Sequence, residues 1–241
     1  MKLETFSDGA VVWRDGTSNA PDRSRQVRDA LQAAIVDHRL APSTKLSEDE
    51  VGEAFGVSRT VVRAALQGLS HAGLVTLERN RGAFVASPGA QEARQVFDAR
   101  RLIEPDIARA SARNYIPKNG KLLRDHCSAE AEALKAGDRR NAIRLSGEFH
   151  LKLADIGGNL ILARFLGELI ARSSLIIALY GRSGVSVCGM HEHRAIISAL
   201  AAKDEDKAAA LMIEHLDHID HDLDLERNPP SPRPLSELLD L

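Results

Sequence analysis

Three histidines recur in the apolar stripes of three separate helical segments in the second half of the chain. They are His150, His193 and His215, and each precedes an aliphatic residue of the same stripe by three or four positions: Leu153, Ile196 and Ile219. Helical spacing turns each imidazole toward the interior of its domain. A single inward histidine is usually a hydrogen-bonded core residue, but neutral imidazoles on three inward faces favour a divalent-metal site. Core histidines without a metal are the alternative.

Two arginines, Arg59 and Arg63, lie four residues apart in the stretch GVSRTVVRAALQGL, residues 56–69. The apolar positions of this predicted helix leave Arg59, Thr60 and Arg63 on another side, and these apolar positions are Val62, Ala65, Leu66 and Leu69. A guanidinium can donate two hydrogen bonds to guanine O6 and N7, or it can hold a phosphate. Together with Ser58 at the helix start, these three residues are candidates to contact DNA. Solvated surface charges are the alternative.

Well-marked helix ends surround these arginines. An amphipathic helix is expected over about 22–37. Ser47, with Glu50 three positions later, forms a capping box, and Leu46 and Val51 form a hydrophobic staple, so a short helix is expected at 47–54. Gly56 ends that helix, and Ser58 is expected to cap the next one with its side chain.

Two β-rich runs follow, at 74–78 and 83–86, around the turn sequence RNRG. Two short helices with a tight turn and then a hairpin form a winged helix-turn-helix, whose second helix enters the major groove of DNA. Arg81 and Gly82, at the tip of the wing, are then placed to reach the DNA backbone or the minor groove. A winged helix that binds only protein is the alternative.

The remainder of the chain is predicted to be helical. After Ser87-Pro88-Gly89, helices are expected at 91–113, 119–136, 139–156, 160–180, 189–203 and 204–224. The fold class is therefore mainly α, a winged helix-turn-helix joined to an antiparallel bundle of about six helices. We predict four regions, which are a mobile arm at 1–21, a DNA-binding domain at 22–87, a helical domain at 91–225 and a Pro-rich tail at 226–241.

Composition narrows the class of protein. The chain has 241 residues, of which 44% are hydrophobic and 27% charged, as in a globular protein with a buried core. Its two cysteines are too few for a disulfide framework, and neither a signal peptide nor a membrane span is evident, so a cytoplasmic protein is expected. The formal net charge is −2, yet residues 57–86 carry four arginines against Glu78 alone. The local positive charge of residues 57–86 therefore allows an acidic partner, although the net charge of the whole chain does not suggest one.

The first domain resembles a known family. The sequence LSEDEVGEAFGVSRTVVRAALQGLSHAGLVTLERNRGAFV is similar to the DNA-binding domain of GntR-type bacterial transcription regulators over about residues 22–86. It departs from the family pattern at Val61, Ala64 and Ser43, and none of these departures removes an arginine. The resemblance implies that the domain binds double-stranded DNA.

The helical domain resembles the effector-binding domain (FCD) of the FadR-like branch of the same regulators. The resemblance rests on RRLIEP, EFHLKLADIGGN, EHRAII and AAALMIEHL, and it spans about residues 93–224. In many relatives an aspartate four residues before the first histidine joins the three histidines around zinc or nickel. Here that position is Ser146. A hydroxyl is a weak, uncharged ligand, so the resemblance implies a divalent-metal site of reduced affinity.

Arg100 and Glu104 stand four residues apart on the first helix of this domain. One interpretation is an ordinary surface ion pair. The family resemblance implies instead that Arg100 faces the ligand cavity, where it would pair with the carboxylate of a small organic acid.

The leading hypothesis is a ligand-responsive transcription regulator, expected to be a repressor and not an enzyme, that binds a palindromic operator as a homodimer. A metal-dependent hydrolase using the three histidines is the enzymatic alternative. No inward carboxylate near these histidines is evident as a general base, and that counts against a hydrolase.

Overall fold

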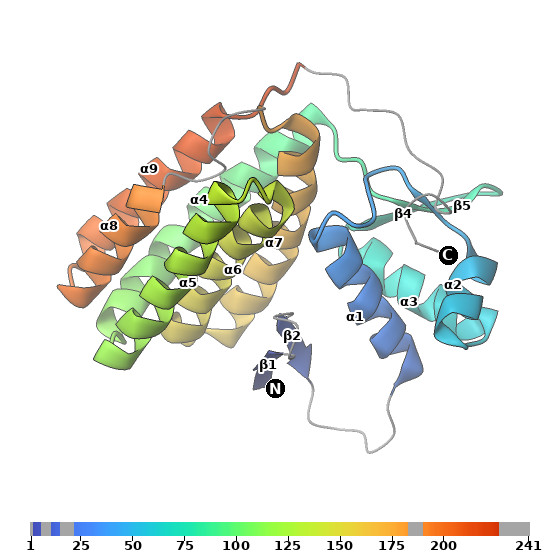
Figure 1. The fold of residues 1–241 in the computed structure, drawn as a ribbon, viewed down its shortest axis with the longest axis horizontal. Coiled ribbons are helices and arrows are strands. Elements are labelled where there is room, and N and C mark those ends of the chain that lie inside the picture. Colours follow the sequence, from blue (N-terminus) through green and yellow to red (C-terminus); the bar gives the residue numbers. More distant parts are fainter. Residues whose placement is uncertain (1, 6–10, 15–21, 183–189, 227–241) are drawn as a thin grey trace. The chain divides into compact units, whose positions relative to one another are not determined.

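The computed structural model describes residues 2–5, 11–14, 22–182 and 190–226 (Figure 1). The chain divides into two compact units between Ser87 and Pro88, in the segment predicted to be a linker. The first unit contains a winged helix-turn-helix and the second is helical, so the predicted fold class is confirmed. Within the described residues, no helix combines the length and the apolar character that a membrane span requires.

Three helices build the core of the first unit, and these are α1 (Arg23–Val36), α2 (Glu48–Phe55) and α3 (Arg59–His71). The buried face of α1 packs against α3. The Ser47 hydroxyl accepts a hydrogen bond from the backbone N–H of Glu50 at 3.5 Å, as a capping residue should. Gly56 ends α2 in the left-handed conformation at φ 60°, which favours glycine. The turn between α2 and α3 is therefore specified by local sequence.

One predicted cap differs in the structure. Ser58 holds the N-cap position of α3, but its side chain accepts no capping hydrogen bond. Its carbonyl oxygen instead accepts from the N–H groups of Val61 and Val62, which starts the helix through the backbone. The hydroxyl of Ser58 is therefore not used by the helix it precedes.

A three-stranded antiparallel sheet in the order β3-β5-β4 completes the winged domain, and its strands are β3 (Lys45–Leu46), β4 (Val75–Glu78) and β5 (Gly82–Val85). The hairpin of β4 and β5 confirms the predicted wing, with Thr76 opposite Phe84. Strand β3 was not predicted, because a strand of two residues is too short to show an alternating pattern. Pairing of β3 with β5 ties the start of the helix-turn-helix to the wing.

Two further strands, β1 (Lys2–Thr5) and β2 (Val11–Arg14), pair antiparallel near the N-terminus. The sequence analysis expected a mobile arm without regular structure over 1–21, and the described part of that segment forms strands instead. Both strands contain residues of high β-propensity, such as Thr5 and Trp13. The rest of 1–21 and residues 227–241 of the predicted tail lie outside the described residues.

Six helices make up the second unit within the described residues, close to the predicted boundaries. They are α4 (Ala90–Arg113), α5 (Pro117–Lys135), α6 (Arg139–Gly157), α7 (Leu160–Tyr180), α8 (Met190–Ala201) and α9 (Glu205–His221). Helix α4 packs against α6, α7, α8 and α9, and α5 packs against α6 and α8. Figure 1 shows these helices side by side as a bundle.

The inward stripe of α4 carries two charged residues among apolar ones. Phe97 and Ala108 are fully buried and belong to the core. Arg100 and Glu104 lie on the same stripe and are equally buried, at 2% and 1% exposure. The bundle therefore encloses charged groups as well as apolar side chains, and the candidate functional site includes these charged groups.

Candidate metal centre and nucleic-acid interface

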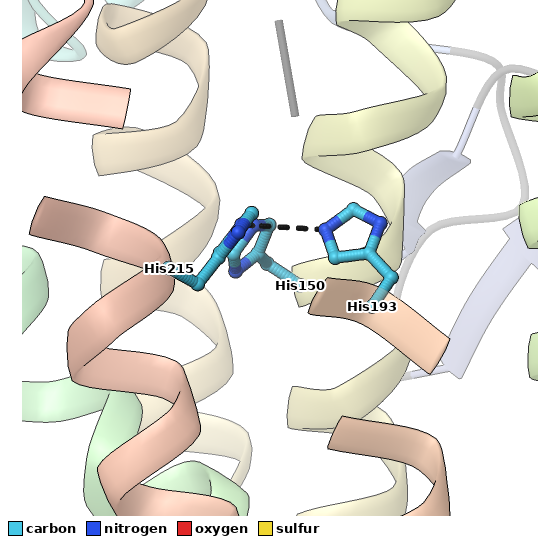
Figure 2. A group of neighbouring side chains, drawn as sticks. All are labelled: His150, His193 and His215. Atoms are coloured by element: carbon cyan, nitrogen blue, oxygen red, sulfur yellow. Dashed lines mark hydrogen bonds between the residues drawn. The ribbon is translucent and has the colours of Figure 1, made fainter. Parts of the chain in front are cut away.

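The bundle brings the three predicted histidines together at its centre. His150 comes from α6, His193 from α8 and His215 from α9, and all three side chains are buried. The Nε2 atom of His215 lies 3.2 Å from that of His150 and 3.3 Å from that of His193. Figure 2 shows the three rings pointing toward one another. Their nitrogen atoms form a compact group of the kind that can hold a metal ion.

A carboxylate lies behind each imidazole ring, on the side away from the other two rings. Nδ1 of His193 lies 2.9 Å from Glu130, Nδ1 of His215 lies 2.7 Å from Glu192, and Nδ1 of His150 contacts Glu104. Because an ionised carboxylate can only accept, it favours the tautomer with the ring proton on Nδ1 and the lone pair on Nε2. Second-shell carboxylates of this kind orient histidine ligands in metal sites.

Burial sets the protonation of this group. It lowers the pKa of His215 to about 3, although the hydrogen bond with Glu192 acts in the opposite direction. Burial also lowers the pKa of His150. Burial by itself would raise the pKa of Glu104, but Arg100 and His150 outweigh it and hold that pKa at about 2. At neutral pH the imidazoles of His150 and His215 are therefore neutral, and the Glu104 carboxyl is ionised.

The donor set fits a divalent cation. In the tautomer with Nδ1–H directed at the carboxylates, the three Nε2 atoms face one another as acceptors. The Nε2 atoms lie 3.2 and 3.3 Å apart, close enough for one cation to contact all three. Phe149 stacks on His193 with ring centroids 3.9 Å apart, which restricts the orientation of that ring. These residues form a group of three nitrogen atoms of the kind that can hold a divalent cation.

No carboxylate from α6 joins the three nitrogen ligands. Ser146 is buried one turn before His150, at the position where the family pattern expects an aspartate. Glu148 is not a substitute, because it forms an ion pair with Arg144. His150 is therefore the residue through which α6 takes part in the nitrogen cluster.

Arg100 is buried and not a surface residue, so the surface ion-pair interpretation was wrong. Its Nε donates to Glu104 Oε1 at 2.6 Å, and Glu104 in turn contacts His150. Its Nη2 atom is buried and has no hydrogen-bond partner among the described residues. Leaving a guanidinium N–H unpaired in a protein interior is costly. The structure thus links the three-histidine group, through Glu104, to an arginine with one donor to spare.

Three carboxylates lie close to the histidines, but each engages an Nδ1 atom. Glu104, Glu130 and Glu192 were not recognised as partners in the sequence. For two of them a signal existed, because Glu104 shares the inward stripe of α4 with Phe97, and Glu130 shares that of α5 with Cys127. For Glu192 the sequence carries no such signal.

In the winged domain, the residues predicted to contact DNA are exposed at the start of α3. Ser58, Arg59, Thr60 and Arg63 are all exposed there. Val62 and Leu66 are buried and anchor the helix, so the arginines project from a fixed support. Nε of Arg59 lies 2.6 Å from Asp49 Oδ1, and Nε of Arg63 donates to Glu48 at 2.8 Å. Both acidic partners lie in the first turn of α2.

The wing displays Arg81 and Gly82 at the turn between β4 and β5. Both residues are exposed, and Gly82 has a φ of 101° that a side chain would strain. Arg81 pairs with Glu78, and its guanidinium lies 5.4 Å from the centre of the Phe84 ring. The wing tip therefore carries a cation supported by the hairpin.

A winged helix-turn-helix followed by an all-helical domain is the architecture of a bacterial transcription regulator. Residues 23–85 match the family of bacterial regulatory proteins called gntR, and residues 95–218 match the FCD domain. The chain therefore belongs to the GntR family of bacterial transcription regulators and carries an FCD domain. This confirms the resemblance inferred from its motifs.

Relatives and solved structures agree with this assignment. The chain is 27% identical over 205 residues to a probable D-xylose utilization operon transcriptional repressor of Paenarthrobacter nicotinovorans, covering 84% of this chain and 90% of that protein. It is 26% identical to the HTH-type transcriptional repressor RspR of Escherichia coli, covering 81% and 86%. A putative GntR regulator from Rhodococcus sp. RHA1 superposes with a TM-score of 0.70 at 25% identity, covering 83% and 96%. E. coli McbR/YncC shares the fold, with a TM-score of 0.72 at 18% identity, covering 81% and 94%.

Proposed function

We propose that this protein is a ligand-responsive repressor whose helical domain senses a small organic acid with the help of a divalent metal. The observation that carries this proposal is the buried group of three Nε2 atoms, each ring held from behind by a carboxylate. Such a group has no evident role in packing, because apolar side chains would fill the same space at lower cost. His150, His193 and His215 would hold the metal, which supplies a Lewis-acid centre for an anionic ligand.

Arg100 supports a carboxylate as the chemical class of the effector. Its unpaired Nη2 donor is buried in the same connected group as His150, and a carboxylate is the anion whose geometry a guanidinium matches best. Ser146 contributes no charge to offset the cation, so an anionic effector would supply what this position lacks. The role of Arg100 is therefore effector binding.

The winged domain would bind operator DNA through Ser58, Arg59, Thr60 and Arg63 in the major groove, and through Arg81 and Gly82 at the wing. The exposure of these residues beside a buried helix face supports this assignment. Since bacterial operators lie in the cytoplasm, the protein would act there. Effector binding would regulate the protein only if the effector has different affinities for the DNA-competent and DNA-incompetent states.

A homodimer would place two recognition helices on the two halves of a palindromic operator. Exposed apolar residues at the start of α7 support self-association. Ile161 is 69% exposed and Phe165 is 55% exposed, and the two lie one turn apart on the same helix. Apolar residues at this spacing on a soluble protein are candidates for a subunit contact.

A regulator is favoured over a metal-dependent hydrolase by the position of the carboxylates. Glu104, Glu130 and Glu192 each engage an Nδ1 atom behind a ring, so none is directed at the Nε2 group as a general base would be. Hydrolysis of a small ester by the metal-loaded protein, abolished by His193→Ala, would support the enzymatic alternative instead.

Native mass spectrometry of the purified full-length protein tests the proposal directly. We expect a dimer mass, one divalent metal per chain, and a retained small acid that is lost in Arg100→Ala. Selection from a randomised duplex library should in parallel enrich a palindromic sequence. A monomer that binds no metal after incubation with zinc or nickel would contradict the sensing mechanism, and failure to enrich any DNA sequence would contradict the regulatory function.

A further inference from the structure

Arg59 and Arg63 of α3 each face a carboxylate of α2 through Nε. Arg63 directs both of its hydrogen bonds to Glu48 from Nε, at 2.8 Å, and Nε is also the Arg59 atom that lies 2.6 Å from Asp49. Within the described residues, the terminal Nη1 and Nη2 atoms of these two arginines make no hydrogen bond. Each carboxylate therefore holds its arginine by the inner nitrogen and leaves the terminal pair of donors available.

The terminal pair is the part of a guanidinium that reads a base end-on. Two parallel N–H groups match guanine O6 and N7, and this contact is the most common specific arginine contact in the major groove. A free arginine samples many rotamers, because its stem has several rotatable bonds. An acidic partner on Nε restricts these rotamers before binding, which lowers the entropic cost of forming the base contact.

Both carboxylates belong to the start of one helix. Glu48 and Asp49 lie in the first turn of α2, where the helix dipole favours negative charge. The Arg63 hydrogen bond lowers the pKa of Glu48, so this carboxyl is ionised at neutral pH. Since α2 packs against α3, its first turn forms a fixed acidic support beside the recognition helix.

The same carboxylates weaken attraction to DNA of any sequence. Non-specific binding depends on the attraction of cations to phosphates, and an acidic group next to each arginine offsets that attraction. A base contact made by Nη1 and Nη2 is weakened less than attraction to phosphates, because the arginine can make this contact while its Nε stays paired with the carboxylate. The carboxylates orient the arginines and also weaken non-specific attraction to DNA. Both effects increase discrimination between DNA sequences.

We propose that Glu48 and Asp49 are positioning residues that increase the sequence specificity of α3 by holding Arg63 and Arg59 on their Nε side. This inference rests on the proposed function, in which α3 reads operator DNA. It assigns the acidic residues of α2 a role in recognition although their charge opposes binding to DNA.

The test compares full-length wild-type protein with Asp49→Asn and Glu48→Gln. Each protein binds the duplex selected by wild type from a randomised library, and a scrambled duplex of the same composition, over a range of salt concentrations. We expect each variant to bind scrambled DNA about two- to fivefold more tightly, because a negative charge near the phosphates is lost. The ratio of specific to non-specific affinity should fall about three- to tenfold, because the arginine is no longer oriented.

Glu53→Gln is the matched control. Glu53 lies on the same helix, is exposed and pairs with no arginine among the described residues. Its loss should leave the affinity ratio unchanged. In an Arg59→Ala background, Asp49→Asn should also leave the ratio unchanged, since the residue it positions is absent.

The outcomes separate this inference from the proposed function. If wild type enriches a DNA sequence but Asp49→Asn and Glu48→Gln keep the wild-type ratio and select the same sequence, the inference is overturned and the proposed function stands. If wild type enriches no sequence, both are overturned. If Glu53→Gln lowers the ratio of specific to non-specific affinity as much as the other two variants do, the effect comes from loss of any negative charge on α2. That result would also overturn the inference.

Discussion

Two arginine–glutamate pairs of similar geometry lie in opposite surroundings in the two units. Nε of Arg63 lies 2.8 Å from Glu48 in the winged domain, and Nε of Arg100 lies 2.6 Å from Glu104 in the helical domain. The side chains of the first pair are 62% and 33% exposed, and those of the second are 2% and 1% exposed. The two units thus use the same chemical pair at the surface and in the core.

Burial gives the two pairs different roles. Solvent screens the surface pair, so it contributes little to stability, and its pairing through Nε leaves the terminal nitrogens of Arg63 available for a base or a phosphate. The buried pair has lost its hydration, so neither member can be removed without leaving an uncompensated charge. We conclude that the exposed arginine of the winged domain keeps donors available for an outside partner, whereas the buried pair of the bundle holds a fixed position.

We expect the largest effect on stability from loss of the buried carboxylate. Glu104→Gln should destabilise the helical domain by about 3–5 kcal/mol, because it leaves the Arg100 guanidinium buried without its counter-charge. Urea unfolding followed by circular dichroism measures this change. The surface counterpart Glu48→Gln is the control and should leave the urea midpoint unchanged. Equal shifts in the two variants would contradict the contrast between the pairs.

The second largest effect is expected for loss of a nitrogen ligand. His215→Ala should lower zinc affinity about a hundredfold or more, since two imidazoles cannot hold the ion as three do. Titration of the metal-free protein with zinc, monitored by calorimetry, provides the measurement. His126→Ala removes another buried histidine, one whose Nε2 donates to the Leu145 carbonyl at 2.7 Å outside the cluster, and should retain zinc binding. Undiminished zinc affinity in His215→Ala would show that the cluster is not the metal site.

A smaller but specific loss is expected on the recognition helix. Arg59→Ala should reduce affinity for the selected duplex by about 1–3 kcal/mol, the value of one bidentate base contact, while stability and metal binding stay as in wild type. Footprinting and fluorescence anisotropy measure the effect on DNA binding. Protection of the same sequence with unchanged affinity would exclude Arg59 from base recognition.

A gain of function is predicted at Ser146. Ser146→Asp should tighten zinc binding about tenfold, because a carboxylate adds a charged ligand to three neutral imidazoles. Competition with a calibrated chelator measures the change, and Ser146→Asn, which adds similar volume without charge, is the matched control. Equal affinities in Ser146→Asp and wild type would indicate that this side chain does not reach the ion.

The smallest effect is expected at the wing. Arg81→Ala should weaken binding to selected and scrambled duplexes alike, by about threefold, and lower the slope of log affinity against log salt by about 1, as for loss of one phosphate contact. Anisotropy titrations at several salt concentrations provide both numbers. A loss confined to the selected duplex would instead assign Arg81 to base recognition.

Much of the winged domain could be predicted from the sequence. Ser47 and Gly56 mark the ends of α2, and Val62 and Leu66 define the buried side of α3, all through contacts within a few positions of the chain. The exception is the partner of each arginine. The Arg63–Glu48 pair joins residues 15 positions apart on different helices, and the sequence patterns of those helices do not specify it.

In the bundle, the helices and the inward direction of the three histidines could be predicted, but their environment could not. The interpretation of Arg100 and Glu104 as a surface pair was wrong because an i, i+4 spacing is the same on either face of a helix. Glu192 was missed because glutamate is a common surface residue, and only packing reveals that this one reaches His215.

The sequence by itself determined where each helix begins and ends, which face each helix buries, and the family to which the chain belongs. Those features depend on caps, turns and apolar periodicity, which act over a few residues. Only the tertiary structure decided that His150, His193 and His215 meet, which carboxylate holds each ring, and which arginine keeps a free donor. The contacts among these histidines join residues 22 to 65 positions apart, and they exist only once the helices have packed.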